Sequence, residues 1–93
     1  IQPIAEIASL CKKYGALLHT DAVQALGKIP VDCGALGLDM LTLSAHKCGG
    51  PVGAAALVVR RGVPFKALFA GGQEGRRRGG TENVAAISGF AKA

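Results

Sequence analysis

The chain has 93 residues, of which 49% are hydrophobic and 18% charged, with no tryptophan, one tyrosine and three phenylalanines. This composition is typical of a globular chain with an aliphatic core and excludes a disordered segment. Eleven lysines and arginines against six aspartates and glutamates give a formal net charge of +5. That charge favours anionic partners such as phosphates, nucleic acids or acidic lipids, without choosing among them.

The apolar runs, the N-terminus and the cysteines indicate the cellular compartment. No apolar run approaches the roughly 20 residues that a membrane span needs, and the N-terminus lacks the features of a signal peptide. Cys11, Cys33 and Cys48 are odd in number and form no Cys-x-x-Cys pair, so neither a disulfide framework nor a zinc site is predicted. We expect a soluble chain without a membrane partner, in a reducing cytoplasm or organelle matrix.

The first predicted element is an amphipathic helix over residues 3–14. Apolar residues recur from Ile4 at helical spacing, Pro3 suits the first turn, and Gly15 suits the position just after the helix. The chain enters this pattern directly and does not begin with Met. We therefore expect residues 1–93 to be a fragment of a longer protein.

Two buried strands follow, and each ends in polar residues. The apolar run 16–18 leads into His19-Thr20-Asp21, and Met40-Leu41-Thr42-Leu43-Ser44 leads into His46 and Lys47. The stretch 22–39 is long enough for the crossover that a parallel pair requires. Because ligands gather beyond the carboxyl ends of such strands, we expect Asp21 and Lys47 at one functional edge.

The remainder of the chain alternates turns and regular elements. Residues 49–53 form a glycine-rich turn, 54–59 a third strand, 71–81 a glycine- and arginine-rich loop, and 83–93 a second helix. The alternation of helix and strand predicts the α/β class, with a mostly parallel sheet flanked by helices.

The polar residues at the predicted edge supply an acid, an amide, a hydroxyl, an imidazole and an amine. Taken singly they have ordinary explanations: Asp21 could cap the next segment, Lys47 and Gln24 could be surface residues, and His46 could be structural. Together they match the needs of pyridoxal 5′-phosphate (PLP), which requires a lysine for a Schiff base, an acid beside the ring nitrogen and donors around the phosphate.

Four motifs in order resemble the cysteine desulfurase family of the class V aminotransferases. They are His19-Thr20-Asp21-Ala22-Val23-Gln24, Ser44-Ala45-His46-Lys47 with Gly50-Pro51-Val52-Gly53, Gly71-Gly72-Gln73-Glu74, and Arg78-Gly79-Gly80-Thr81-Glu82-Asn83. The resemblance spans essentially the whole chain. It implies that residues 1–93 are the central part of the PLP-binding large domain of a fold-type-I enzyme. One departure is Gly75-Arg76, where the family order is Arg then Gly.

The resemblance also implies a role for each residue of the candidate site. Lys47 would be the Schiff-base lysine and the general base, Asp21 would pair with the ring nitrogen, and Gln24 would contact the ring hydroxyl. Ser44 and His46 would hold the phosphate. Thr81 would reach the phosphate in the neighbouring subunit of a homodimer. No metal is implied.

The implied activity is the conversion of L-cysteine to L-alanine, with sulfur passed as an enzyme persulfide to an acceptor or scaffold protein for iron–sulfur cluster or thio-cofactor synthesis. In the family the nucleophilic cysteine lies beyond Ala93, so the fragment alone is expected to be inactive. Cys48, directly beside Lys47, is expected to be structural.

Three alternatives stay open on sequence. A selenocysteine lyase or another class V relative would use Asp21 and Lys47 in the same roles. A metal-dependent hydrolase would use imidazole and carboxylate ligands, namely His19, Asp21, Asp39 and His46. A basic nucleic-acid module would rest on the net charge, although the aromatic platforms that stack on single strands are lacking, so we expect no nucleic-acid partner.

Overall fold

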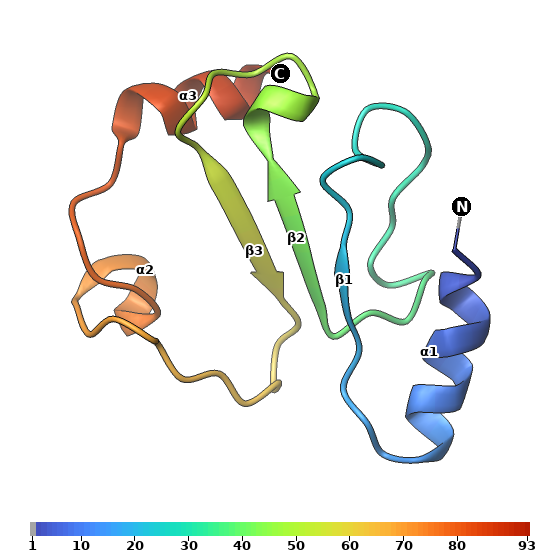
Figure 1. Ribbon diagram of the computed structural model, residues 1–93. Helices are drawn as coiled ribbons and strands as arrows, with labels where there is room; N and C mark the ends of the chain where they lie inside the picture. The colour runs from blue at the N-terminus through green and yellow to red at the C-terminus, as the bar shows by residue number, and fades with distance from the viewer. Residues whose placement is uncertain (1) are drawn as a thin grey trace.

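The computed structural model describes residues 2–93 and has a small sheet, with one long helix beside β1 and another across one end of the sheet (Figure 1). The elements in chain order are α1 (Ile4–Lys13), β1 (His19–Asp21), β2 (Met40–Ser44), the 3-10 helix η1 (Ala45–Lys47), β3 (Ala55–Val59), α2 (Gln73–Arg76) and α3 (Val84–Lys92). The predicted helices are thus confirmed to within one residue at each described end. None of the helices within 2–93 has the length and apolar character to cross a membrane.

The three strands form one sheet in the order β1-β2-β3. β1 and β2 run parallel, with His19 opposite Met40 and Asp21 opposite Thr42. β2 and β3 run antiparallel, with Ser44 opposite Ala55. The α/β class is confirmed, and the sheet is mixed because the connection from β2 to β3 is too short for the crossover that a parallel pair needs.

The ends of the helices follow local rules. Gly15 has φ +67°, and its N–H donates to the Lys12 carbonyl at 3.3 Å, so it ends α1 as predicted. At α3 the Asn83 side chain accepts from the Ala86 N–H at 3.2 Å. The predicted buried strand at 16–18 is wrong: the strand is His19–Asp21, and residues 16 and 17 before it are exposed. Leu18 nevertheless pairs with the chain before β2, because its carbonyl accepts from the Asp39 and Met40 N–H groups.

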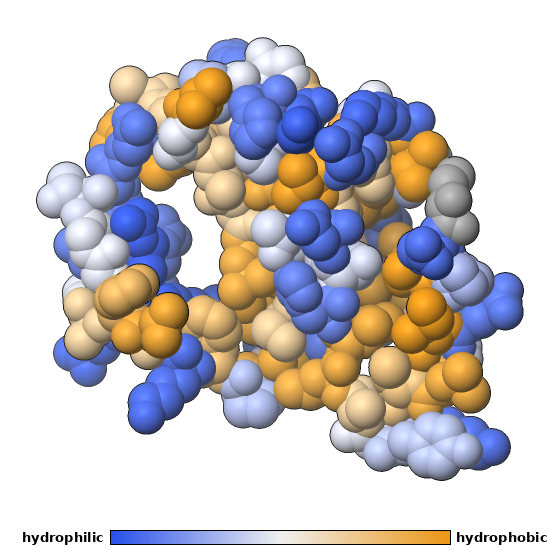
Figure 2. All heavy atoms as spheres, in the orientation of Figure 1, coloured by the Kyte–Doolittle hydropathy of each residue, from blue (hydrophilic) through white to orange (hydrophobic). Residues whose placement is uncertain are grey.

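Buried residues gather in two small clusters. One joins Ala22, Leu38 and Leu41, with Ile4 of α1 packed against it. The other joins Ala45, Ala54 and Ala86, with Phe90 packed against it. Because Ala45 begins η1 and Ala86 belongs to α3, the second cluster fixes η1 against α3. Apolar side chains also lie on the surface, which Figure 2 shows as broad orange areas.

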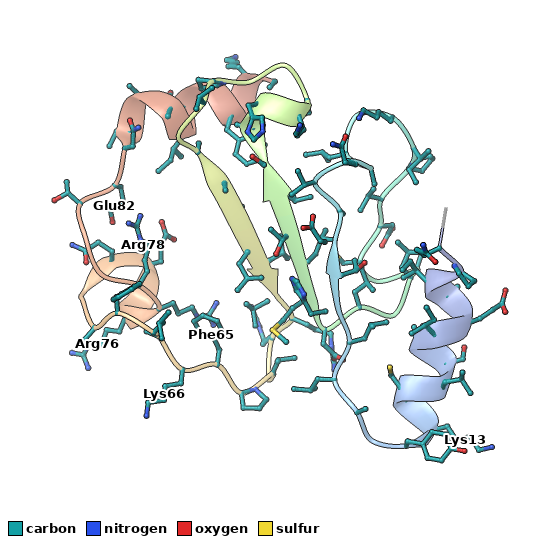
Figure 3. The ribbon with its side chains drawn as sticks, in the orientation of Figure 1. Lys13, Phe65, Lys66, Arg76, Arg78 and Glu82 are labelled. Atoms are coloured by element: carbon teal, nitrogen blue, oxygen red, sulfur yellow. The ribbon has the colours of Figure 1, made fainter. Side chains whose placement is uncertain are left out.

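The arm, residues 61–83 between β3 and α3, loops away from the sheet and carries α2 (Figures 1 and 2). It is pinched where Gly71 meets Gly79, because a Cβ on Gly71 would lie 2.7 Å from the Arg78 carbonyl oxygen. Figure 3 shows Lys66, Arg76 and Arg78 on this arm. The predicted loop 71–81 is therefore a tight excursion, and its short element α2 is a turn in which Glu74 and Gly75 have left-handed backbone.

Candidate functional site

The carboxyl ends of β1 and β2 lie side by side, and their polar residues share one face of the sheet. Asp21 is the register partner of Thr42, and Ser44 follows two residues later on β2. Since alternate strand residues point to the same face, Asp21, Thr42 and Ser44 lie on one side. The parallel pairing thus brings together residues that are more than 20 positions apart in sequence.

Asp21 is exposed at the end of β1, and its carboxylate is oriented by the backbone that follows. The Val23 N–H donates to Asp21 Oδ1 at 2.9 Å, which is a local turn of the kind that aspartate favours. Asp21 therefore does cap the segment that follows it, as its ordinary explanation predicts. Because this hydrogen bond uses one oxygen, the second oxygen remains for another partner.

Ser44 and His46 form a hydrogen-bonded pair at the end of β2. Ser44 Oγ and His46 Nδ1 are 2.8 Å apart, with Ser44 buried and His46 exposed. The chain turns sharply between them into η1, whose first residue, Ala45, is fully buried. The pair presents a hydroxyl and an imidazole at the edge of the sheet, which suits the binding of an oxyanion.

Lys47 is the last residue of η1 and is exposed. The turn beneath it is held by the Cys48 and Gly50 N–H groups, which donate to the Ala45 carbonyl at 3.0 and 2.9 Å. A Cβ on Gly50 would lie 3.0 Å from Ala45 Cβ, so this close approach favours glycine. The Cys48 thiol is half-buried 3.3 Å from the same carbonyl, as expected for a structural cysteine. The backbone that carries Lys47 is therefore held in place by hydrogen bonds and close packing.

Gln24 and Thr81 are placed differently from the other candidates. Gln24 lies in the turn after β1, and its Oε1 accepts from Lys28 Nζ at 2.7 Å, which leaves the amide NH₂ available to donate. Thr81 lies on the arm next to Glu82, which Figure 3 shows across β3 from β1. One copy of the chain therefore does not bring Thr81 to Asp21.

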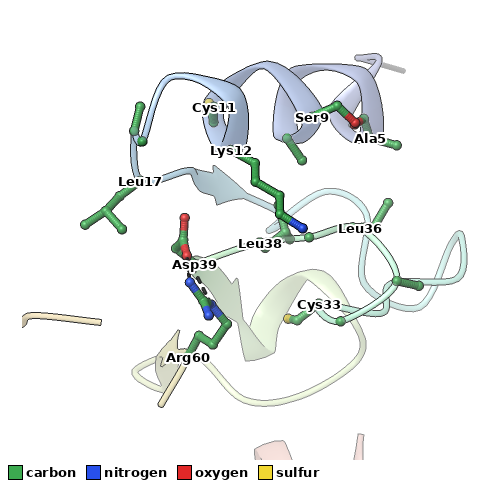
Figure 4. Close-up of a pocket in the computed structure, with 16 residues that line it drawn as sticks. Ala5, Ser9, Cys11, Lys12, Leu17, Cys33, Leu36, Leu38, Asp39 and Arg60 are labelled. Carbon is green, nitrogen blue, oxygen red and sulfur yellow. Dashed lines mark hydrogen bonds and ion pairs between the residues drawn. The ribbon is translucent and has the colours of Figure 1, made fainter. Parts of the chain in front are cut away.

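Asp39 and Arg60 form an ion pair at the opposite end of β2 (Figure 4). Asp39 is buried and accepts from the Leu18 N–H at 2.8 Å and from Arg60 Nε at 3.1 Å. The Leu18 N–H, followed by Arg60, lowers the pKa of the Asp39 carboxyl. The sequence reasoning missed this pair, although an acid before one strand and an arginine after its antiparallel neighbour are a usable signal.

A cleft of about 640 Å³ adjoins this ion pair, between α1 and residues 33–39 (Figure 4). Lys12, Cys11 and Cys33 are among its lining residues. It lies at the start of β2, whereas Ser44, His46 and Lys47 lie at the end of that strand. The cleft is therefore separate from the candidate site.

A second pair that sequence reasoning missed is His19 and Thr42. His19 Nε2 and Thr42 Oγ1 are 2.7 Å apart across β1 and β2. Both residues share the face that carries Asp21. Strand alternation alone places His19 on that face, but the partner depends on the register.

The family model for class-V aminotransferases matches residues 1–93. The chain belongs to the aminotransferase class-V family. It is 55% identical over 94 residues to a cysteine desulfurase of Sinorhizobium fredii, which covers 100% of this chain and 24% of that protein. This class-V chain therefore spans about a quarter of the length of the relatives it matches.

Solved structures of similar proteins have the same fold over this stretch. A NifS-like protein from Rickettsia africae has a TM-score of 0.94 and 48% identity, over 99% of this chain and 26% of that one. SspA in complex with cysteine has a TM-score of 0.93 and 38% identity, over 99% and 27% of the two chains. The similarity to NifS-like enzymes confirms the expected fold.

PLP is the cofactor of class-V aminotransferases, and the groups at the strand ends fit it. Its phosphate needs donors, its ring nitrogen needs an acid, and its aldehyde carbon needs a primary amine. The end of β2 offers the Ser44–His46 pair, the end of β1 offers the Asp21 carboxylate, and η1 ends on the Lys47 amine. The set contains each chemical type once, on three neighbouring elements, β1, β2 and η1.

Proposed function

We propose that the protein containing this chain is a PLP-dependent cysteine desulfurase, with residues 1–93 forming part of its cofactor-binding large domain. The observation that carries the proposal is the 55% identity to a cysteine desulfurase along the whole chain, combined with Asp21 at the end of β1 and Lys47 in the turn that follows β2. The SspA structure, solved in complex with cysteine, supports L-cysteine as the substrate.

Each site residue then has a role in holding the cofactor. Lys47 would hold the cofactor covalently, and Asp21 would pair with its ring nitrogen through the oxygen that Val23 leaves free. Gln24 would donate its NH₂ to the ring oxygen, since Lys28 already occupies its carbonyl. The Ser44 hydroxyl and the His46 imidazole would bind the phosphate.

When bound, PLP supplies an electron sink for bond breaking at the substrate α-carbon. Lys47, once released from the cofactor, would move the proton at that carbon as general base. The rigid turn beneath Lys47, fixed through Ala45, would limit where its amine can travel. A nucleophilic cysteine elsewhere in the protein would take the sulfur as a persulfide and leave alanine.

The proposal extends to assembly and partners. Because Thr81 lies on the arm, away from Asp21, it would serve the phosphate of the partner subunit in a homodimer. The persulfide sulfur would pass to an acceptor or scaffold protein for iron–sulfur cluster or thio-cofactor synthesis. A reducing cytoplasm or organelle matrix remains the prediction from the cysteine pattern.

Geometry weighs against the metal-hydrolase alternative. Asp39 and His46 flank the five residues of β2, each of which spans roughly 3.3 Å, so they cannot share one ion. His19 and Asp39 are also engaged by Thr42 and Arg60. Among the residues that the structure describes, no three histidine, cysteine or acidic side chains are grouped to hold a metal.

The test uses the full-length protein, titrated with PLP, trapped with borohydride and digested for peptide mapping. We expect a visible absorbance band, and a label on Lys47 that is lost in Lys47→Ala and retained in Lys13→Ala, which removes an exposed lysine at the end of α1. With excess dithiothreitol to reduce the enzyme persulfide, equimolar alanine and sulfide should form from L-cysteine. The same assay with L-selenocysteine tests the selenocysteine lyase alternative. A label on any other lysine contradicts the assignment.

A further inference from the structure

The His19–Thr42 hydrogen bond has no part in the roles given above, yet it lies beside Asp21. The two side-chain atoms are 2.7 Å apart across the parallel strands. Thr42 is the register partner of Asp21, and neighbouring strands lie roughly 4.8 Å apart. The His19 imidazole and the Asp21 carboxylate are therefore two acceptors of β1 on the face that carries the Thr42 hydroxyl.

In the structure the Thr42 hydroxyl pairs with His19. Within residues 2–93, the only hydrogen bond that the Asp21 side chain accepts comes from the Val23 N–H. We take His19 as the neutral tautomer protonated on Nδ1, so that its Nε2 accepts the one proton that the Thr42 hydroxyl can donate. Once that proton is given to His19, it is not available to Asp21.

We infer that His19 is a positioning residue, which engages the Thr42 hydroxyl and so reserves one Asp21 oxygen for the ring nitrogen of PLP. The inference rests on the proposed function, because it takes Asp21 as the partner of that nitrogen. A proton donated from Thr42 to Asp21 would stabilise the carboxylate and make it a poorer acceptor. The charge-assisted pair between the carboxylate and the ring N–H would then weaken.

The test measures the dissociation constant of PLP for the full-length protein by the absorbance of the bound cofactor. His19→Phe keeps an aromatic ring in β1 but releases the Thr42 hydroxyl, and the Kd should rise about tenfold, the effect of weakening one hydrogen bond to a charged group. Thr42→Val removes the hydroxyl at nearly constant shape, and alone it should leave the Kd within about twofold of the parent value.

The double variant His19→Phe/Thr42→Val decides the matter. It should return the Kd to within about threefold of the parent value, because no hydroxyl is left to compete for Asp21. His19→Gln, whose amide oxygen can accept the same proton, should match the parent. Thr20→Val removes a hydroxyl from the opposite face of β1 and controls for the general effect of such a change.

A purely structural cross-strand contact makes a different prediction. Thr42→Val would then be as harmful as His19→Phe, and the double variant would recover nothing, which overturns the inference. The unfolding midpoint of each cofactor-free variant separates folding defects from binding defects, and His19→Leu replaces His19→Phe if the latter does not fold.

Failure of the proposed function gives a different signature. If the parent protein does not bind PLP, or if Asp21→Asn binds it as tightly as the parent, the assignment of Asp21 is wrong and the inference falls with it. If the parent binds, Asp21→Asn binds poorly and the double variant does not recover, the inference alone is wrong.

Discussion

Single residues at the start of β2 hold the sheet together at the end away from the candidate site. The Asp39 side chain accepts from Leu18 before β1 and from Arg60 after β3, while the Arg60 N–H donates to the Asp39 carbonyl at 2.9 Å. One buried carboxylate thereby joins all three strands. Its charge is stabilised by these donors, so its ionisation is linked to folding.

The stability of the protein should therefore fall in acid. The folded pKa of Asp39 is lowered, so its contribution is complete above the ordinary carboxyl pKa and is lost as pH falls through the folded value. Asp39→Asn should lower the unfolding midpoint at pH 7 and flatten its decline below about pH 4, the ordinary range for aspartate. Glu6→Gln, on the exposed face of α1, is the control. An unchanged acid limb in Asp39→Asn contradicts the prediction.

Arg76 is strained within the arm. It has φ +67°, and it follows Glu74 at +49° and Gly75 at +64°. A left-handed conformation costs a non-glycine residue roughly 1–2 kcal/mol, so Arg76→Gly should raise the free energy of unfolding by about 1 kcal/mol. Arg77→Gly, at φ −95°, should not. Denaturant titration of both variants measures these changes. If Arg77→Gly raises the free energy of unfolding as much as Arg76→Gly does, backbone strain at Arg76 is not the cause.

At the scale of elements, α3 supports the turn that carries Lys47. Ala86 of α3 packs with Ala45 of η1 and with Ala54, and all three are small enough for close approach. Gly89, one turn further along α3, meets the ring of Pro51. The helix is therefore positioned by small residues at both contacts.

Gly89→Ala should destabilise the protein, against the usual preference of helices for alanine. The new Cβ would lie 2.8 Å from Pro51 Cγ, and overpacking of this kind costs roughly 1–3 kcal/mol. The higher helix propensity of alanine alone would raise the free energy of unfolding by roughly 1 kcal/mol. Ser88→Ala, at an exposed position of α3, is the matched control. A higher unfolding midpoint for Gly89→Ala would contradict the prediction and show that α3 moves away from Pro51 at little cost.

At the scale of the whole molecule, much apolar surface lies outside the two clusters. Leu68 and Phe69 of the arm are 89% and 74% exposed, and Val52 beside η1 is 83% exposed. Surfaces of this kind mark contacts with other parts of a protein or with another chain. The proposed homodimer would use the arm in this way.

Mixed dimers test whether Thr81 acts across subunits. If it does, a Lys47→Ala subunit paired with a Thr81→Val subunit contains one site with both defects and one intact site. Full-affinity PLP binding at about one site per mixed dimer is expected, whereas each parent variant dimer should have none. Titration of co-expressed, doubly tagged dimers measures this. If Thr81 acts within its own subunit, no full-affinity site appears.

Local rules were enough to predict several features from the sequence. Apolar spacing predicted α1, α3 and the ends of β2, and Gly15 ends α1 as expected. The α/β class followed from the order of elements. The polar groups near the ends of β1 and β2, among them Asp21 and Lys47, could also be predicted, because each group follows an apolar run in the sequence.

Residue types and spacing by themselves determined which elements form and which groups lie at their ends, because these depend on contacts a few positions apart. Only the tertiary structure decided that β3 runs antiparallel, that Asp39 binds Arg60 and that His19 engages Thr42. The latter two pairs lie 21 and 23 positions apart, and each depends on strand register. Register arises from packing and pairing across the whole sheet, so no short stretch of sequence specifies it.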